Sequence, residues 1–458
     1  MSARVDELIC LSPVDGREYA RRPLATDGQV ELALERARRA QREWARALLG
    51  ERCATMLRFL EAMEALNPQI VPELAWQMGR PVRYGGELRS LAERVRAMVE
   101  IAEPALAAEV AESGRSVVRV PVGTVLVIAP WNYPFLTAAN TIVPALLAGN
   151  AVLLKHSAQT PLAGERFAEA FRAAGLPDGL FANLFLSHEQ TARLLASALV
   201  GHAVFTGSVE GGREVERAAA GSFTTLTLEL GGKDPAYVRA DADLSAAVEA
   251  LVDGSFYNSG QSCCGVERIY VDEAVWDPFL NGFLEAARQY RLGDPLDPET
   301  SLGPMASARG AEQVRRQVRE AIDAGACAHV PGQLFPRDGG AYLMPQVLTG
   351  VDHGMAVMRE ETFGPAVGIM KVKDDGEAVR LMNDSAYGLT ASIWTRDLAT
   401  AERLAAEVEA GTVFANRCDY LDPLLAWTGV KNSGRGASLG RYGFESVTRP
   451  KSLHLRSL

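Results

Sequence analysis

The sequence predicts an α/β protein with two lobes, each built around a parallel β-sheet. From about residue 113, short apolar strands alternate with helical stretches of about 10 to 15 residues, which is typical of βαβ units. The chain has 458 residues, and at ~150 residues per domain this length suggests two or three structural units. Hydrophobic residues make up 48 % and charged residues 23 %, which indicates a globular protein with a large core.

The first hundred residues are predicted to be helical. Thr26 is a suitable N-cap, and apolar residues follow at helical spacing from Val30 to Trp44. The same periodicity runs through Glu51–Leu66 and Glu87–Ala108. We therefore expect amphipathic surface helices before the first sheet begins.

The predicted strands and helices of the two lobes then follow in order. Strands are expected over Ser116–Pro130, Ala151–Lys155, His202–Ser208, Thr225–Gly232 and 268–272, and helices over Thr160–Gly175, from Glu210, over 243–258 and over 401–411. The stretch Leu230–Lys233 carries a glycine pair and is the best boundary between the lobes. Because parallel sheets bind ligands beside the carboxyl ends of their strands, we expect the functional residues to gather in a cleft there.

Charge and cysteine content exclude several classes of protein. The net charge is −10 and no basic block occurs, which argues against a nucleic-acid partner and against binding to an anionic membrane surface. No apolar run approaches the ~20 residues that span a bilayer, and the N-terminus does not resemble a secretory signal. The six cysteines are sparse, so we expect a reducing, cytoplasmic environment. No CxxC, HxxxH or HExxH pattern occurs, so no metal site is expected.

Two adjacent cysteines stand between glycines in the stretch SGQSCCG, at Cys263 and Cys264. Free cysteines are most often small buried hydrophobic residues, but flanking glycines allow a ligand to approach the backbone closely. One of the pair is therefore a candidate nucleophile.

Two further polar residues stand at strand ends. Glu229 ends an apolar strand, where it is either a salt-bridge or capping residue or a general base for water. Asn132 follows the strand GTVLVIA, where an asparagine serves turn chemistry or donates to an oxyanion. Gly207, Ser208 and Gly212 begin a helix and suit a pyrophosphate, although the pattern is not GxGxxG. The scattered histidines disfavour a Cys–His hydrolase.

Seven motifs in order carry a family resemblance: APWNYP, LLKHSAQTP, FTGS with Gly212, LELGGK, FYNSGQSCCGVER, EETFGP and TGVKNSGRG. With them, nearly the whole chain resembles the aldehyde dehydrogenase superfamily. The resemblance implies two Rossmann-like doubly wound lobes and a small β oligomerisation arm. Residues 1–102 and 122–230 would form the cofactor-binding domain, 231–432 the catalytic domain, and 103–121 with 433–458 the oligomerisation segment. A homodimer or homotetramer is implied.

The resemblance also implies the roles of individual residues. Cys263 would attack an aldehyde, Asn132 and the Cys263 backbone N–H would hold the oxyanion, and Glu229 would activate the water that hydrolyses the thioester. NAD or NADP would be bound by Trp131, Lys155, Ser157, Gly207, Ser208, Gly212, Glu361 and Phe363. The aldehyde entrance would be shaped by Tyr133, Thr137, Asn140, Arg417 and Trp427.

Two departures from the family pattern bear on specificity. Ala158 stands where a ribose-binding glutamate is common, so a 2′-phosphate is not repelled; NADP is then tolerated, with Lys155, His156 and Ser157 as its partners. Arg417, on the predicted entrance loop, could pair with the carboxylate of a semialdehyde or form a salt bridge to Asp419 or Asp422. The chain most resembles the compact succinate-semialdehyde dehydrogenase branch. The alternatives are a CoA-acylating enzyme, disfavoured by Glu229, and a dehydrogenase for neutral aliphatic or aromatic aldehydes.

Overall fold

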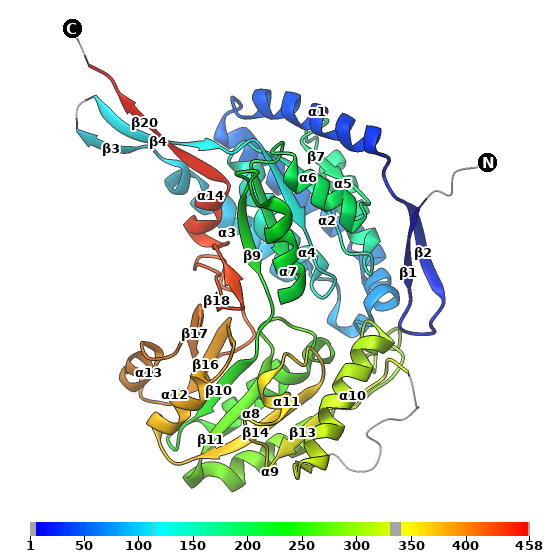
Figure 1. Ribbon diagram of the computed structural model, residues 1–458, viewed down its shortest axis with the longest axis vertical. Coiled ribbons are helices and arrows are strands. Elements are labelled where there is room, and N and C mark those ends of the chain that lie inside the picture. Colours follow the sequence, from blue (N-terminus) through cyan, green and yellow to red (C-terminus); the bar gives the residue numbers. More distant parts are fainter. Residues whose placement is uncertain (1–5, 113, 330–339, 457–458) are drawn as a thin grey trace.

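The computed structural model describes residues 6–112, 114–329 and 340–456 (Figure 1). Within these ranges the chain forms two lobes, each with its own mainly parallel sheet, and a three-stranded arm that projects from the first lobe. The α/β fold class expected from the sequence is therefore present in the structure.

The first lobe contains a six-stranded sheet of strand order β19-β9-β8-β5-β6-β7. Only β19 is antiparallel to its neighbour. Ile128, at the end of β5, is level with Lys155 on one side and Phe205 on the other, so three strands end along one edge. The strand order reverses between β5 and β8, which is where doubly wound sheets bind ligands. The strands are β5 (Thr124–Ile128), β6 (Ala151–Lys155), β7 (Phe181–Asn183), β8 (His202–Thr206), β9 (Thr225–Glu229) and β19 (Gly434–Arg435).

Helices of the first lobe enclose an apolar core. Phe59 and Phe171 stack with their ring centroids 4.2 Å apart. Nearly every residue of α4 is buried, which explains why this helix is apolar on all sides. The helices are α1 (Asp27–Trp44), α2 (Leu49–Met78), α3 (Leu88–Leu106), α4 (Pro134–Leu147), α5 (Pro161–Ala173), α6 (His188–Ala196), α7 (Val209–Ala219) and α14 (Gly440–Ser446), with the 3-10 turn η1 (Val82–Tyr84) after α2.

The second lobe is organised around a seven-stranded sheet of order β12-β13-β14-β11-β10-β16-β17, in which only the β12–β13 pair is antiparallel. Its strands are β10 (Asp234–Val238), β11 (Val266–Asp272), β12 (Cys327–Ala328), β13 (Gln346–Thr349), β14 (Ala366–Val372), β16 (Thr390–Trp394) and β17 (Thr412–Ala415). Its helices are α8 (Leu244–Phe256), η2 (Tyr257–Gly260), η3 (Glu273–Val275), α9 (Trp276–Ala287), α10 (Ala308–Asp323), α11 (Ala356–Arg359), α12 (Asp375–Asn383) and α13 (Leu398–Ala405). A separate antiparallel pair is formed by β15 (Tyr387–Gly388), which precedes β16, and β18 (Val430–Lys431), which precedes β19.

The chain passes from β9 to β10 through only four residues, 230–233. A crossover this short carries the chain from the carboxyl edge of the first sheet directly to the amino edge of the second. The cleft expected at the carboxyl ends of parallel strands is therefore bordered by those ends in the first lobe and by the amino ends of the strands in the second. Residues just before β11 and β14, rather than after them, face the first lobe.

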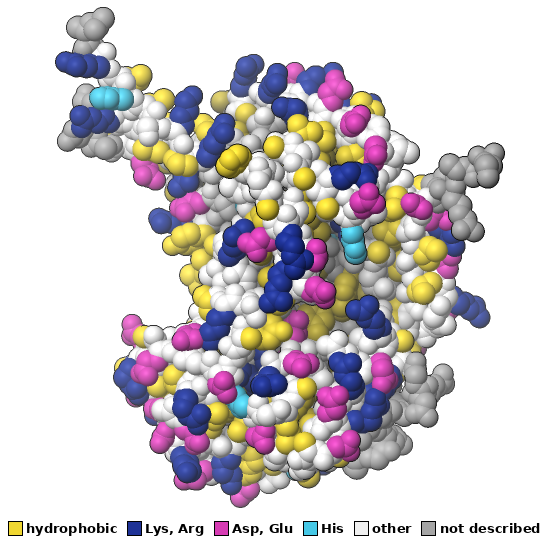
Figure 2. Space-filling view, viewed as in Figure 1, with side chains coloured by type: hydrophobic (Ala, Val, Ile, Leu, Met, Phe, Trp, Pro, Cys, Tyr) yellow, Lys and Arg dark blue, Asp and Glu magenta, His cyan; other side chains and the backbone are white. Residues whose placement is uncertain are grey.

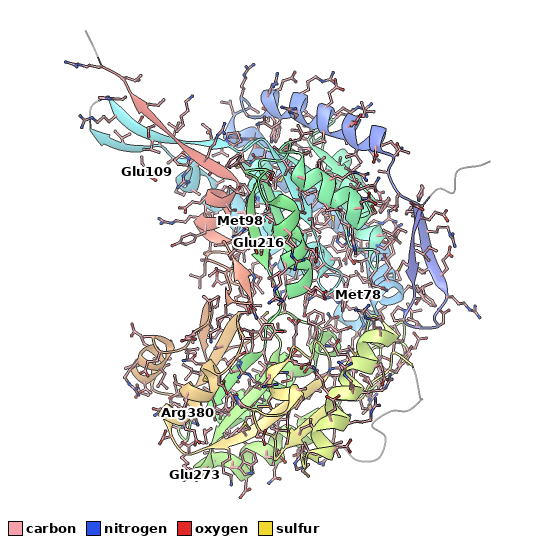
Figure 3. All side chains as sticks on the ribbon, in the orientation of Figure 1. Met78, Met98, Glu109, Glu216, Glu273 and Arg380 are labelled. Carbon is pink, nitrogen blue, oxygen red and sulfur yellow. The ribbon has the colours of Figure 1, made fainter. Side chains whose placement is uncertain are left out.

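The arm consists of β3 (Glu109–Glu112), β4 (Arg115–Pro121) and β20 (Thr448–His454), in the order β20-β4-β3. The pairs are antiparallel, and β20 pairs with β4 over its full length, from Thr448 opposite Pro121 to His454 opposite Arg115. Figure 3 labels Glu109 at the base of this arm, and Met78 near the junction of the lobes.

The N-terminal segment differs from the expected all-helical reading. Residues 7–23 form a hairpin of β1 (Glu7–Leu11) and β2 (Glu18–Pro23), whereas α1, α2 and α3 match the three helices predicted from periodicity. Strand β1 alternates exposed and buried side chains, and Asp15–Gly16 lies in the connection. This alternation indicates a strand, but the prediction of helices for the first hundred residues did not take it into account.

Positive and negative side chains are interspersed over the face shown in Figure 2, without a block of either sign. Among the described residues, no helix is both long enough and apolar enough to cross a membrane.

Candidate active site

The turn after β5 carries Asn132 and is fixed by a buried ion pair. Arg80 contacts Glu87 at 2.7 Å, and its other terminal nitrogen donates to the Asn132 carbonyl at 2.7 Å. Glu87 in turn accepts from the backbone N–H groups of Phe135 and Leu136, at the start of α4. The pair therefore satisfies free helix-terminal donors and fixes the turn at the same time.

Asn132 reaches across to the cysteine loop. Its Nδ2 donates to the Gln261 carbonyl at 3.2 Å, and Asn258 Nδ2 donates to the same carbonyl and to that of Asn132. An amide nitrogen has two hydrogens, so one hydrogen of Asn132 Nδ2 remains for a ligand. The candidate oxyanion donor and the candidate nucleophile thus belong to one hydrogen-bonded unit.

The cysteine loop has an unusual backbone. Asn258, Ser259 and Gly260 have φ values of 53°, 58° and 68°, three left-handed residues in succession. A Cβ at Gly260 would fall 2.3 Å from the Gly364 carbonyl oxygen, so only glycine fits there. Ser259 donates to the Gly303 carbonyl. Strain of about 1–3 kcal/mol per such non-glycine residue is characteristic of functional sites.

The two adjacent cysteines border the same cavity but differ in burial and in hydrogen-bond partners. Cys264 is buried and its thiol donates to Asp419 Oδ1 at 3.1 Å, where Ser262 Oγ also donates at 2.6 Å. A hydrogen bond with the Cys263 thiol, burial and the Asp419 carboxylate together raise the pKa of Cys264 well above its ordinary value. Cys263 is only half-buried and lines a cavity. Cys264 therefore stays a thiol, and Cys263 is the candidate nucleophile.

Glu229 lines the same cavity as Cys263. Its carboxylate accepts from Thr206 Oγ1 at 2.9 Å and from Ser438 Oγ. Burial raises the pKa of Glu229, while the two hydroxyls and the more distant Arg94 partly oppose that rise. A carboxylate held in this way suits a general base. Ser438 was missed from the sequence because it is 209 residues away, whereas Thr206 lies directly opposite Glu229 in the β8–β9 register.

The glycine pair of LELGGK makes room for two other groups. A Cβ at Gly231 would fall 2.1 Å from the Glu361 carboxylate, and one at Gly232 would fall 2.6 Å from the Cys263 carbonyl oxygen. The Gly232 N–H donates to Glu361 at 3.2 Å. Burial raises the pKa of Glu361 to about 8. The absence of side chains at Gly231 and Gly232 thus lets Glu229, Cys263 and Glu361 lie close to one short crossover.

Trp131 and Phe363 meet between the lobes, with ring centroids 5.5 Å apart and an edge-on arrangement. Phe363 has a φ of 50°, and its N–H donates to Glu267 at 2.8 Å. Glu267 also accepts from the Thr362 N–H and from the buried Lys233. The Glu267 carboxylate therefore fixes the backbone of the loop that carries Glu361 and Phe363.

The remaining predicted cofactor residues lie along the edge of the first sheet. Lys155 is half-buried, burial lowers its pKa, and its side-chain nitrogen forms no hydrogen bond or ion pair with any described residue. Ser208 caps α7 by accepting from the Gly211 N–H. Gly207 and Gly212 lie close to the Phe205 ring and the Leu230 side chain respectively, so both are also required for packing.

The His156 ring is buried and both of its nitrogens have protein partners, which contradicts the predicted role of His156 toward a 2′-phosphate. Its ring is buried and contacts the Pro134 carbonyl at 3.1 Å and Thr160. Burial lowers the pKa of His156 to about 4, so the ring is neutral. Ser157 accepts from the Gln159 N–H, and Ala158 is exposed.

The cavity beside Cys263 has a volume of about 370 Å³. Of the predicted entrance residues, it is lined by Tyr133, Thr137, Asn140 and Trp427. Arg417 is not among its lining residues; it is exposed, and its guanidinium carbon lies 3.3 Å from the centroid of the Tyr420 ring. Among the described residues Arg417 forms no ion pair with Asp419 or Asp422, so the predicted salt bridge is not formed there.

Comparison with known proteins places this arrangement in a family. The model of the aldehyde dehydrogenase family matches residues 1–453, and the chain belongs to that family. It is an aldehyde dehydrogenase by class, as the seven motifs predicted, and its relatives include enzymes named as NADP(+)-dependent.

Three of its relatives illustrate the range of the family. Betaine aldehyde dehydrogenase 2 of Rhizobium meliloti is 35 % identical, over 98 % of this chain and 94 % of its own. Succinate-semialdehyde dehydrogenase (NADP(+)) 1 of Mycobacterium tuberculosis is 33 % identical, over 97 % and 98 %. The structure of succinic semialdehyde dehydrogenase from Streptococcus pyogenes, in complex with NADP+, superposes with a TM-score of 0.93 at 28 % identity, over 98 % and 100 %. The predicted fold class is confirmed by this agreement.

Proposed function

We propose that this enzyme oxidises an aldehyde to a carboxylic acid by a hydrolytic route through Cys263. The observation that carries the proposal is that Cys263 and Glu229 line one cavity while Asn132 is bonded to the cysteine loop. The Cys263 thiolate adds to the aldehyde carbon, and Asn132 Nδ2 with the Cys263 N–H stabilises the oxygen of the thiohemiacetal. After hydride loss leaves a thioester, Glu229 takes a proton from water, which adds to the carbonyl and releases the acid and the thiol.

NAD or NADP fits the residues between the lobes. When bound, the nicotinamide accepts the hydride. Lys155 offers a cation without a protein partner, the N-terminus of α7 offers free N–H groups, and Glu361 is held beside Gly232 for a ribose. Ala158 adds no negative charge near Lys155. We therefore infer that NADP is accepted, through Lys155 and Ser157 rather than His156.

We infer further that the substrate is an aldehyde with a terminal carboxylate, such as succinate semialdehyde. Two of the three relatives above carry that activity in their names. The two hydroxyls on Glu229 favour water over coenzyme A as the acyl acceptor, because they hold a base where the acceptor attacks.

Replacement of Cys263 and Glu229 tests the route. We expect Cys263→Ala to abolish reduced-cofactor formation while retaining cofactor binding. Glu229→Gln should give one burst of reduced cofactor per active site and then stall as the thioester, detectable by mass spectrometry of the intact protein. Cys327→Ser, at an exposed thiol on β12, is the matched control and should behave as wild type. Formation of acyl-CoA on adding coenzyme A, with full turnover in Glu229→Gln, would support the acylating alternative instead.

The same proposal assigns a role to each segment of the chain. We infer that 1–102 with 122–230 binds the cofactor, that 231–432 carries the nucleophile, and that 103–121 with 433–458 joins subunits. The arm supports the last inference, because Val110 and Leu455 are 74 % and 71 % exposed on it. Light scattering of the full chain should give a dimer or tetramer.

A further inference from the structure

The cavity beside Cys263 is lined by eight charged side chains, and most of them are already paired. Arg80 is paired with Glu87, Glu229 accepts from two hydroxyls, and Asp419 accepts from Ser262 and Cys264. Glu93 accepts from the Tyr420 hydroxyl. The remaining three are Arg89, Arg94 and Asp253. Arg89 and Asp253 are exposed to solvent, so water satisfies them. Arg94 is different, because it is a buried cation.

Arg94 lies on α3 and is only 7 % exposed. Its Nη1 donates to the Leu136 carbonyl at 3.1 Å and to Asn140 Oδ1 at 2.7 Å, and both acceptors are neutral. Among the described residues it forms no ion pair, and its Nε and Nη2 make no hydrogen bond with them. Burial lowers the pKa of Arg94, but a guanidinium remains charged in proteins. A buried cation without a partner carries a cost of several kcal/mol, which an arriving anion would offset.

Asn140 adds a second unused donor at the same place. It is 2 % exposed, and its Nδ2 is buried without a hydrogen-bond partner. Because its Oδ1 is taken by Arg94, the amide group turns its hydrogens away from the guanidinium. Arg94 and Asn140 therefore present N–H groups only, which is the requirement of a carboxylate.

Both residues line the cavity that contains Cys263 and Glu229. We propose that Arg94 and Asn140 form the subsite that binds the distal carboxylate of an ω-carboxy aldehyde while its aldehyde carbon reaches Cys263. This inference rests on the proposed function, and it places the recognition of charge on α3 and α4 rather than on the loop that carries Arg417. Leu136 holds the guanidinium through its carbonyl and thereby sets its direction.

Arg94 has one competing explanation. It lies near enough to Glu229 to lower the pKa of that carboxyl, so it could serve the base instead of the substrate. The two roles predict different effects of an Arg94 substitution on the oxidation of aldehydes that lack a carboxylate. Support of Glu229 would matter equally for every aldehyde, whereas a carboxylate subsite matters only for those that carry the group.

The test compares succinate semialdehyde, butanal and betaine aldehyde as anionic, neutral and cationic substrates. Arg94→Met and Asn140→Asp are the variants, the second because it gives Arg94 an internal carboxylate partner of nearly unchanged shape. We expect wild type to prefer succinate semialdehyde. Each variant should lower the ratio of kcat/KM for succinate semialdehyde to that for butanal about 100-fold, equivalent to ~2.7 kcal/mol. Arg96→Met, an exposed arginine of the same helix, is the control and should leave the ratio unchanged.

A binding measurement separates this inference from the proposed chemistry. Succinate, which cannot react, should bind wild type and Cys263→Ala alike in calorimetry and should bind Asn140→Asp at least 10-fold more weakly. If succinate binds but no aldehyde is oxidised, the proposed function fails while the subsite stands. Equal losses for all three aldehydes in the variants, a wild-type preference for betaine aldehyde, or unchanged succinate binding in Asn140→Asp would each overturn the subsite.

Discussion

The hydroxyl of Ser438 offers the sharpest test of how the proposed base is controlled. Ser438 Oγ donates to one oxygen of Glu229 and Thr206 Oγ1 donates to the other. Burial raises the pKa of Glu229, and the Ser438 hydrogen bond is the largest effect that opposes this rise. Ser438→Ala removes that opposition and leaves the burial in place. The pKa of Glu229 should therefore move further upward.

The magnitude follows from the hydrogen bond that is lost. A hydrogen bond to a charged group contributes ~1.5–3 kcal/mol, and at 1.36 kcal/mol per factor of ten the lower value corresponds to about a tenfold change. Glu229 must be ionised to take a proton from water, so deacylation is active above its pKa and is lost as the pH falls. In Ser438→Ala the acid limb of the deacylation rate should shift to higher pH. On that limb the rate should be about tenfold below wild type, and at high pH the two rates should converge.

The assay follows release of the acid from the acyl-enzyme in single turnovers between about pH 5 and pH 10. Thr206→Val, which keeps the side-chain shape but removes the other donor, should shift the limb in the same direction. Ser446→Ala is the control, since its hydroxyl donates to the Gly443 carbonyl of its own helix and to no other described residue. An acid limb that stays in place, or a rate that falls equally at every pH, would show that Ser438 only positions Glu229 and would refute the reasoning.

Three further predictions concern cofactor, substrate and stability. Ala158→Glu should lower kcat/KM for NADP about 100-fold relative to NAD, because it adds a negative charge near Lys155; a wild-type preference for NAD above 100-fold would already contradict the premise. Arg417→Met should leave kcat/KM for succinate semialdehyde within about twofold of wild type, as expected for an exposed side chain off the cavity; a large rise in KM would restore the entrance-loop hypothesis. Glu361→Gln should stabilise the cofactor-free protein in urea unfolding at neutral pH but not at pH 4. The pKa of Glu361 is about 8 in the folded protein and 4.5 in the unfolded chain, so the wild-type free energy of unfolding falls as the pH rises from 4.5 to 8. If the stability gained by Glu361→Gln did not grow over this pH range, the burial of Glu361 would not be the cause.

The strands whose carboxyl ends form one edge of the first sheet could be predicted, because the sequence patterns that indicate them are local. Strands ending at Ile128, Lys155, Thr206 and Glu229 are short apolar runs, and parallel pairing necessarily aligns their ends. The motif residues followed from the family resemblance in the same way. The hairpin of residues 7–23 was not predicted, although polar and apolar residues alternate along its first strand, because the helical pattern of about the next 80 residues was extended over it.

Arg94 could not be found from sequence because nothing distinguishes it from its neighbours. The segment of α3 carries Arg89, Arg94 and Arg96, and an amphipathic helix usually exposes all such residues. Only the packing of α3 against α4 buries one of them and leaves two exposed. Arg417 shows the converse, since its loop does border the cavity through Asp419, Tyr420 and Leu421, but its own side chain turns outward onto an aromatic ring.

The proposed base and the proposed nucleophile come from different lobes, so their distance depends on what joins the lobes. Glu229 belongs to the first sheet and Cys263 to the loop before β11; the chain joins their sheets through residues 230–233 and again between β17 and β19. Three contacts reinforce these connections: Gly303 lies against the Gly79 carbonyl, Arg80 donates to Asn258, and Asn132 donates to Gln261. Arg80 also holds the carbonyl of Asn132, and the third contact is made by Asn132 itself. We therefore expect a substitution at Gly303 or Arg80 to move Glu229, Cys263 and Asn132 relative to one another, and to impair catalysis although it changes none of the three.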